Sequence, residues 1–327
     1  MEITRTFFIL LFIFSSHLGL GSENNKPWIR LKSAIEYLKV DPKNNTKLAY
    51  SLEFDAGLGV IDLKTKKISK LSSKPVQGSY DWAPDGIRLV FRERFLNKDG
   101  KITSQVNIYD SVLEKIIPLE TIPHSSGYLA IDPVDYKLHL LHENGVMRKQ
   151  LKLPDSRLAR WQLKLKEKPG YWLATQKAPI FLPKSSIEMQ SVTVHAGALH
   201  SYDISSDGLS IAWATTDGKI YASKMGEKPR FVDLGMDPKW FHHENKLVYA
   251  GARKVGEKTV GYDLKISAPG GTKKWITHTY HSDERWPVPL KDKSILYTKD
   301  KTTDLYALRF SEISRGAPAK GQNKRNL

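Results

Sequence analysis

The stretch SYDWAPDGIRLVF at residues 79–91 decides the fold, because it returns without a gap as SYDISSDGLSIAW at 201–213. Each copy reads as a short first strand, a tight turn with Asp-Gly at its tip, and an apolar second strand. A two-residue hairpin turn needs a residue with positive φ, and Gly86 and Gly208 supply it. We therefore interpret the aspartate of the motif as a structural residue of the turn, and the stretch as a structural repeat.

Weaker copies of the stretch run through the rest of the chain. Short runs of alternating apolar and polar residues, separated by Asp-Gly and Asn-rich turns, are typical of successive antiparallel hairpins. Helical periodicity is nearly absent. The second strands are LAYS at 48, LVFR at 89, LHLL at 138, IAWA at 211, LVYA at 247 and ILYT at 295, and YWLATQ with APIFLP supplies a seventh copy in the weakly patterned region 155–195.

The copies predict an all-β fold, a seven-bladed β-propeller, with six blades if 155–195 is a decorated connection. Their anchors recur at intervals of roughly 34 to 49 residues, the period at which a four-stranded sheet forms one blade. The last copy, at about 283–311, shows only three strands, which would leave an unpaired edge. We predict that the alternating segment PWIRLKS at 27–33 closes the ring beside the third strand of the last blade.

WAPDGIRLVF, with its weaker partners, resembles the WD-like repeat of TolB-type propellers, which also occurs in the propeller of prolyl-oligopeptidase relatives. The resemblance covers nearly the whole mature chain and implies the same propeller fold. It does not include the separate N-terminal domain of TolB proteins. Only the copy at 79–120 carries the full set of Trp, Pro, Asp and Gly, and the copies at 131, 204 and 240 keep parts of it.

We divide the chain into a signal peptide at 1–22, a propeller at 23–314 and a basic flexible tail at 315–327. Arg5 precedes the apolar run FFILLFIF at 7–14, and small residues follow, which is the layout of a secretory signal peptide. The run is too short to span a bilayer. This layout predicts export to the periplasm or the exterior. The chain has no cysteine, so its stability must come from an ordinary core rather than from disulfides.

The formal net charge of +16 predicts attraction to anionic partners. The lysines are dispersed among acids, with local excess only at 64–70 and in the tail, so a solvated lysine-rich surface is the simpler interpretation. Attachment to an anionic surface through these lysines is the other interpretation, and it would weaken steeply with salt. We expect the partner to be an envelope protein or an anionic envelope polymer rather than nucleic acid, and the protein to be a monomer without a stable membrane span.

Catalytic and metal-binding motifs find little support in the sequence. It contains no Gly-x-Ser-x-Gly elbow of a serine hydrolase. The first strands of a propeller line its central channel, where carboxylates can hold calcium. Two carboxylates with two lysines predict self-compensating charges, so we expect no cofactor, with calcium in the channel as the alternative. The positions that correspond to Asp81 are Lys39, Ala130, Asp203, Lys239 and, loosely, Pro287.

The predicted binding residues are Tyr80, Asp81, Tyr202 and Asp203. They begin equivalent first strands three blades apart, so we expect them to face one another across the channel mouth and to grip an inserted segment. The other interpretation is that the tyrosines pack and the aspartates bond turn amides. Trp286 lies outside the repeat register and is the candidate for a surface contact.

The sequence therefore predicts an exported, non-catalytic TolB-like platform that binds a protein or an envelope polymer. We assign no catalytic residue. The alternative is a metal-dependent hydrolase or lactonase that uses the central channel, which a bound calcium or zinc would favour.

Overall fold

The computed structural model describes residues 27–309, apart from 32–33, 53–56, 77–78, 84, 124–128, 132–136, 143–144, 151–169, 175–178, 184–189, 192–197, 206–207, 242–243, 269–270, 280 and 301–302. Within these ranges every regular secondary-structure element is a β-strand, as the hairpin pattern predicts. The predicted signal peptide and basic tail lie outside the described residues. Nothing in the described ranges is a helix with the length and apolarity needed to cross a membrane.

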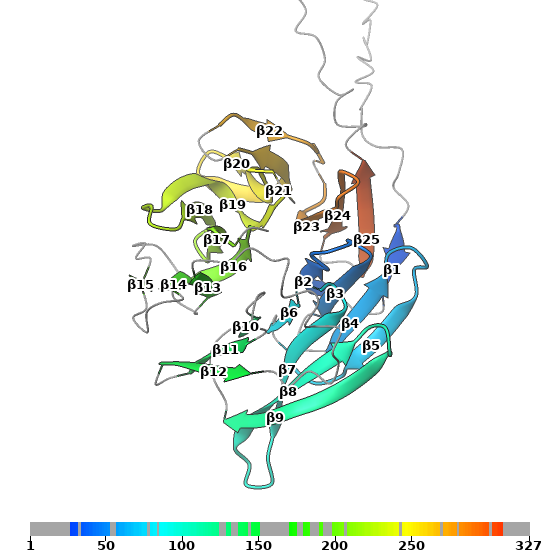
Figure 1. The fold of residues 1–327 in the computed structure, drawn as a ribbon. Helices are drawn as coiled ribbons and strands as arrows, with labels where there is room; N and C mark the ends of the chain where they lie inside the picture. Colours follow the sequence, from blue (N-terminus) through cyan, green and yellow to red (C-terminus); the bar gives the residue numbers. More distant parts are fainter. Residues whose placement is uncertain are drawn as a thin grey trace, which may run out of the picture.

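The strands form antiparallel sheets that follow one another along the chain (Figure 1). The opening stretch forms the first two strands of the second sheet, and the weakly patterned region contributes a sheet of its own. The first four sheets contain β2 (Ile35–Val40), β3 (Lys47–Leu52), β4 (Leu58–Asp62) and β5 (Ile68–Ser72); β6 (Tyr80–Trp82), β7 (Arg88–Leu96), β8 (Ile102–Asp110) and β9 (Lys115–Pro123); β10 (Leu129–Ile131), β11 (Lys137–His142) and β12 (Gly145–Gln150); and β13 (Gly170–Ala174), β14 (Pro179–Pro183) and β15 (Gln190–Ser191).

One strand in the second half of the chain serves two repeat units. The first part of β19, up to Leu234, pairs with β18, and the part from Gly235 onward pairs with β20. A Cβ atom on Gly235 would lie 2.3 Å from the carbonyl oxygen of Ala250, so only glycine fits at this point. The strands of this long sheet are β16 (Leu199–Ile204), β17 (Ser210–Thr215), β18 (Lys219–Lys224), β19 (Arg230–Trp240), β20 (Leu247–Val255), β21 (Lys258–Ser267) and β22 (Lys273–Trp275).

The last sheet combines both ends of the described chain. It contains β23 (Glu284–Pro289), β24 (Ser294–Lys299) and β25 (Asp304–Arg309). β1 (Ile29–Arg30) pairs with β25, with Ile29 opposite Leu305 and Arg30 opposite Asp304. This strand belongs to the segment for which the sequence predicts a place beside the third strand of the last repeat.

The first strand of each repeat unit lies nearest the centre of the molecule (Figure 1). The strands β2, β6, β10, β13, β16, β19 and β23 contact one another in chain order, and β23 also contacts β2. The second strands lie one step further out, and β3, β7, β17, β20 and β24 are buried on both faces. Runs of four or five consecutive buried residues occur in β3, β7, β17, β20 and β24.

The core therefore consists of layers between neighbouring sheets. One layer joins the first and second sheets through residues that include Ala49, Val60, Leu89 and Phe91. Another joins the last sheet to the first through Leu38, Leu48, Leu296 and Leu305. Side chains from the first and last parts of the chain thus share one apolar layer, which holds the two chain ends together.

Asp41 organises the turn between β2 and β3. Its fully buried carboxylate accepts hydrogen bonds from the backbone amides of Asn44, Asn45, Thr46 and Lys47, at 2.5 to 3.1 Å. The Asp-Gly turn of the opening stretch packs against the same carboxylate. Gly86 has φ +66°, and a Cβ atom there would lie 2.8 Å from Asp41 Oδ1. Glycine is required at position 86 both for the turn and for this contact between neighbouring sheets.

Replacing Asp41 by alanine should strongly destabilise the protein. The substitution leaves four backbone amides without the buried carboxylate that they share as an acceptor, and we expect the free energy of unfolding to fall by about 3 kcal/mol. Asp62 caps an exposed turn through the amides of Lys64 and Thr65, and its replacement should cost only about 1 kcal/mol. Urea unfolding of the two variants measures the difference. Equal losses would contradict the role given to burial.

Candidate functional site

Four charged residues of the innermost strands are paired between neighbouring repeat units. Lys39 Nζ lies 3.4 Å from Asp81 Oδ1, and Lys239 Nζ lies 3.4 Å from Asp203 Oδ1. The strand registers place these four residues at equivalent positions, opposite Ala49, Val90, Ala212 and Val248 of the respective second strands. The charges compensate one another, as the sequence predicts. We call these four residues, with Tyr80 and Tyr202, the inner layer.

Lys39 connects strands that are not neighbours. Its Nζ lies 5.8 Å from the ring centroid of Tyr80 and 5.7 Å from that of Tyr202. β6 is a neighbour of β2, whereas Tyr202 belongs to β16, which lies elsewhere in the sequence of inner strands. Tyr80 and Tyr202 are therefore close enough to face a common ammonium group, which both rings stabilise through their π faces.

The six residues differ in what they offer to a ligand. Tyr80 is buried, and its hydroxyl donates to the carbonyl oxygen of Tyr37 at 2.8 Å. Burial raises the pKa of Tyr80 well above its usual range. Tyr80 is thus a packing residue, which is the second interpretation drawn from the sequence. Asp81 is the accessible member, because its side chain keeps 37% of its exposure.

Both aspartates also bond backbone amides. The amide of Trp82 donates to Asp81 at 3.1 Å, and the amide of Trp240 donates to Asp203 at 2.9 Å. Each aspartate therefore contacts both a lysine side chain and a backbone amide of an inner strand. Trp82 and Trp240 themselves are buried, as expected for residues at one repeat position.

The predicted place of these residues within their strands is wrong in one respect. Tyr202 and Asp203 lie near the end of β16, not at its start, and Lys39 lies near the end of β2. A bulge between Leu199 and Ser201 lengthens β16 before the repeat motif begins. The inner layer consequently lies toward the end of the first strands where the Asp-Gly turns follow.

Trp286 is not a surface residue, contrary to the sequence-based expectation. It is only 8% exposed, its ring stacks on His200 at 5.9 Å between centroids, and it contacts Tyr37 at 4.8 Å. Its φ of +52° belongs to a bulge that ends at Pro287 and turns the ring inward. Because of this bulge Val288, rather than Pro287, takes the place that corresponds to Lys239.

The same bulge occurs one repeat earlier, at Asp237, which has φ +54° and precedes Pro238. Asp237 is fully buried and accepts hydrogen bonds from Arg285 Nε at 2.6 Å and Nη2 at 3.3 Å, with His200 Nε2 at 3.5 Å. Burial alone would raise the pKa of Asp237, but the charge of Arg285 and the bonds from His200 and Arg285 hold it well below its usual range. Sequence reasoning missed this network. Its only signal is that Asp-Pro and Trp-Pro occupy one repeat position.

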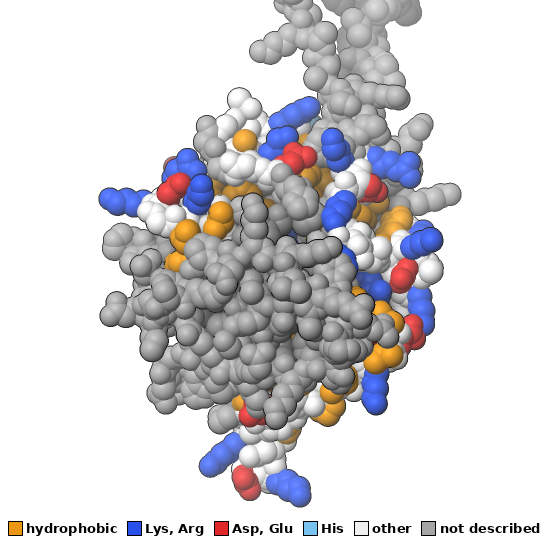
Figure 2. All heavy atoms as spheres, viewed as in Figure 1, with side chains coloured by type: hydrophobic (Ala, Val, Ile, Leu, Met, Phe, Trp, Pro, Cys, Tyr) orange, Lys and Arg blue, Asp and Glu red, His pale blue; other side chains and the backbone are white. Residues whose placement is uncertain are grey.

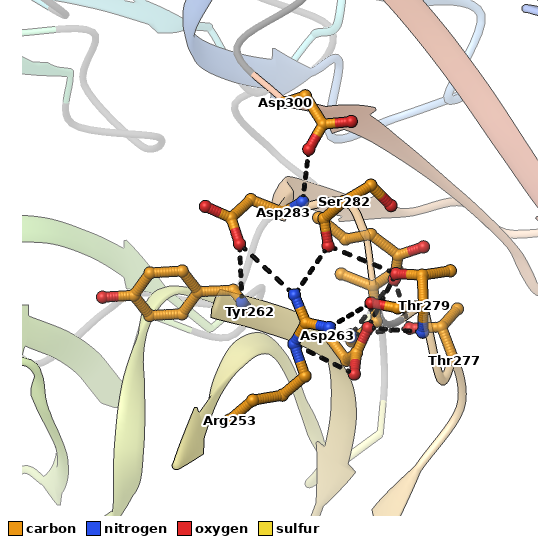
Figure 3. Close-up of polar contacts among 10 residues, drawn as sticks. Arg253, Tyr262, Asp263, Thr277, Thr279, Ser282, Asp283 and Asp300 are labelled. Atoms are coloured by element: carbon orange, nitrogen blue, oxygen red, sulfur yellow. Dashed lines mark hydrogen bonds and ion pairs between the residues drawn. The ribbon is translucent and has the colours of Figure 1, made fainter. Parts of the chain in front are cut away.

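A second polar cluster lies between β20, β21 and the segment that leads into β23 (Figure 3). Arg253 forms ion pairs with Asp263 and Asp283, both at 3.5 Å, and its Nη2 donates to the carbonyl oxygen of Ser282 at 2.9 Å. Asp263 in turn accepts bonds from the amide and hydroxyl of Thr279. The arginine holds the connection between two sheets in place.

Glu284 borders this cluster and is fully buried. The hydroxyl of Thr277 donates to its Oε2, whereas Oε1 has no hydrogen-bond partner. Burial raises the pKa of Glu284 to about 7, and nearby Asp263 adds to the rise. In the described ranges no group of three or more His, Cys, Asp or Glu side chains is arranged to hold a metal ion.

The arrangement of sheets agrees with solved structures. A chain of the mitotic checkpoint complex matches with a TM-score of 0.58 and 15% identity, over 88% of this chain and 96% of that chain. The β-propeller domain of Cps50 (Swd1) from Myceliophteria thermophila matches with a TM-score of 0.56 and 13% identity, over 86% of this chain and 98% of that domain. The fold is a β-propeller. No family model and no curated protein matches the sequence.

The buried Glu284 should make the stability of the propeller depend on pH. The native state keeps a proton on Glu284 up to about pH 7, while the unfolded chain releases it near pH 4.5. The free energy of unfolding therefore falls as pH rises through this window, by an amount on the order of 3 kcal/mol. Glu284→Gln should remove this slope.

Chemical denaturation at a series of pH values from 4.5 to above 7 measures how the free energy of unfolding changes with pH. Glu244→Gln provides the matched control, because Glu244 is exposed and forms an ion pair with Lys246. A pH slope that is the same in wild type and Glu284→Gln would show that Glu284 is not responsible.

Proposed function

We propose that this protein is an exported, non-catalytic propeller with seven blades that binds another protein or an anionic polymer of the cell envelope at its inner layer. The observation that carries this proposal is that the charged side chains of the inner layer form ion pairs and remain partly exposed. Lys39, Asp81, Asp203 and Lys239 are all held in ion pairs and partly exposed. They form a charge-compensated polar surface at the centre of the proposed ring.

Three observations support the ring. Inner strands from seven consecutive repeat units contact one another in order, and the last contacts the first. β1 supplies the fourth strand of the last sheet. The region of weak sequence pattern forms the hydrogen-bonded strands β13, β14 and β15. A seven-bladed ring closed by the N-terminal strand accounts for all three, and the WD-like, TolB-type repeat of the sequence agrees with it.

The inner layer suits a partner that inserts a polar segment. Tyr202 and Lys39 present an aromatic face beside a cation, and Asp81 presents an accessible carboxylate. A segment with both an acidic and a basic group finds a complement in this layer without leaving a buried charge unpaired. The similar mitotic checkpoint complex chain is itself part of a protein assembly, which supports the same general role.

A metal-dependent hydrolase in the channel is the less favoured function. The two inner-layer carboxylates that could hold a cation are each neutralised by a lysine at 3.4 Å. A cation would have to displace these lysines before it could bind.

Site-specific photo-crosslinking in the source cell tests the proposal. A photoreactive phenylalanine analogue at Tyr202 should give one discrete adduct, because Tyr202 belongs to the inner layer. The matched position is Phe231, an aromatic residue 54% exposed on the outer part of β19, which should not give this adduct. Lys39→Met, which removes the central cation, should reduce the adduct several-fold. No adduct at Tyr202, or the same adduct at both positions, would overturn the proposal.

A further inference from the structure

Two turns of the same type lie side by side at one edge of the propeller. In the β4–β5 turn, Asp62 Oδ1 accepts the amides of Lys64 at 3.0 Å and Thr65 at 2.7 Å. In the β8–β9 turn, Asp110 Oδ1 accepts the amides of Val112 at 2.9 Å and Leu113 at 3.0 Å. The fourth residue after the start of each turn has positive φ, namely +61° at Lys66 and +50° at Glu114.

The β8–β9 turn does not require apolar residues at positions 112 and 113. Lys64 and Thr65 occupy the same positions in an otherwise equivalent turn, so polar residues satisfy its geometry. Val112 is nevertheless 61% exposed and Leu113 66% exposed. Turn apices normally carry polar residues, because aliphatic side chains there remain in water. The pair is therefore available to a partner.

The two turns form one continuous surface. Lys67 and Glu114 join them through an ion pair at 2.6 Å, which places their neighbours Ile68 and Leu113 on the same edge. Ile68 and Ile116 are exposed as well. Figure 2 shows hydrophobic side chains beside lysines and arginines over β5 and the β8–β9 turn.

Positive charge surrounds these aliphatic side chains. Five exposed lysines lie beside Glu114 and the partly buried Asp62, while the buried Asp110 of the second turn is paired with Arg88, so the surface is basic. At its far end Lys66 lies over the ring of partly buried Trp28, at 5.2 Å from the ring centroid. We call this surface the basic–aliphatic rim; it consists of Trp28, Ile68, Val112, Leu113, Ile116 and the lysines 64, 66, 67, 70 and 115.

We propose that the basic–aliphatic rim binds peripherally to an anionic lipid bilayer. Lysines attract anionic headgroups, and aliphatic side chains at a turn apex can enter the boundary between headgroups and acyl chains. A tryptophan at the border of such a surface suits the same interface. The apex projects outward rather than lining a groove, so it fits a deformable bilayer better than a preformed acidic peptide site. The contact is separate from the inner layer and leaves it open to its own partner.

Co-sedimentation of the full chain with vesicles tests this inference. Vesicles of phosphatidylcholine with phosphatidylglycerol should bind the protein, vesicles of phosphatidylcholine alone should not, and binding should weaken as salt rises. Val112→Ser with Leu113→Ser should lower the partition coefficient by at least about tenfold. Lys64→Gln with Lys66→Gln should lower it by roughly fivefold for each lysine.

The β7–β8 hairpin provides a matched control. Leu96 is 67% exposed and Ile102 is 50% exposed, and they form a cross-strand pair beside Lys98 and Lys101, at the opposite end of β8 from the rim. Leu96→Ser with Ile102→Ser removes equal apolar area and should leave binding unchanged. All variants should keep the melting temperature of the wild type, since the altered side chains are exposed.

Three results would overturn the inference. The first is that anionic vesicles do not bind the wild type. The second is that the rim variants bind as well as the hairpin variants. The third is that a polyglutamate peptide binds at the rim, with loss in Val112→Ser and Leu113→Ser, while vesicles do not, which would assign the rim to an acidic protein. None of these results bears on crosslinking at Tyr202, so the two proposals fail independently.

Discussion

The structure depends on the second strands of the repeat units, which are apolar on both faces and must therefore be covered on both. In β7, β17, β20 and β24 five consecutive residues are buried, so both faces of each strand must be covered. A sheet with a two-sided apolar strand is stable only between two other sheets, and each of those has the same requirement. A linear stack would leave an apolar face exposed at each end. The last sheet shares an apolar layer with the first, which covers an apolar face of each.

The polar centre follows from the same constraint. Sheets that pack face to face bring their first strands together around one axis, where side chains are too close to carry like charges. The chain places lysine and aspartate on neighbouring first strands, as in Lys39 with Asp81 and Lys239 with Asp203. Where β19 meets β23, Arg285 and the bulge residue Asp237 likewise neutralise each other's charge, but as a buried ion pair. The inner layer is thus both part of the stability of the ring and the surface proposed to bind.

Sequence pattern predicts the strands well and the inner side chains only in part. Alternation, apolar second strands and Asp-Gly turns depend on local residues, so the propeller fold and the pairing of residues 29–30 with the last sheet could be anticipated. Trp286 could not be placed, because its bulge depends on a bond to Asp237, which lies 49 residues earlier in the sequence. The burial of Tyr80 likewise depends on a distant contact, because its hydroxyl donates to the carbonyl oxygen of Tyr37, which lies 43 residues earlier in the sequence.

Hydrogen–deuterium exchange of the second strands tests the central claim most directly. In the proposed seven-bladed ring every second strand lies between two neighbours, so backbone amides at 48–51, 89–92, 138–141, 180–182, 211–214, 247–250 and 295–298 should exchange slowly and with similar protection, through global unfolding. The segment 180–182 is the most informative, since it lies in the region where the repeat pattern is weakest. Exchange of this segment as fast as an exposed turn, with the others protected, would contradict a single ring of mutually covered sheets.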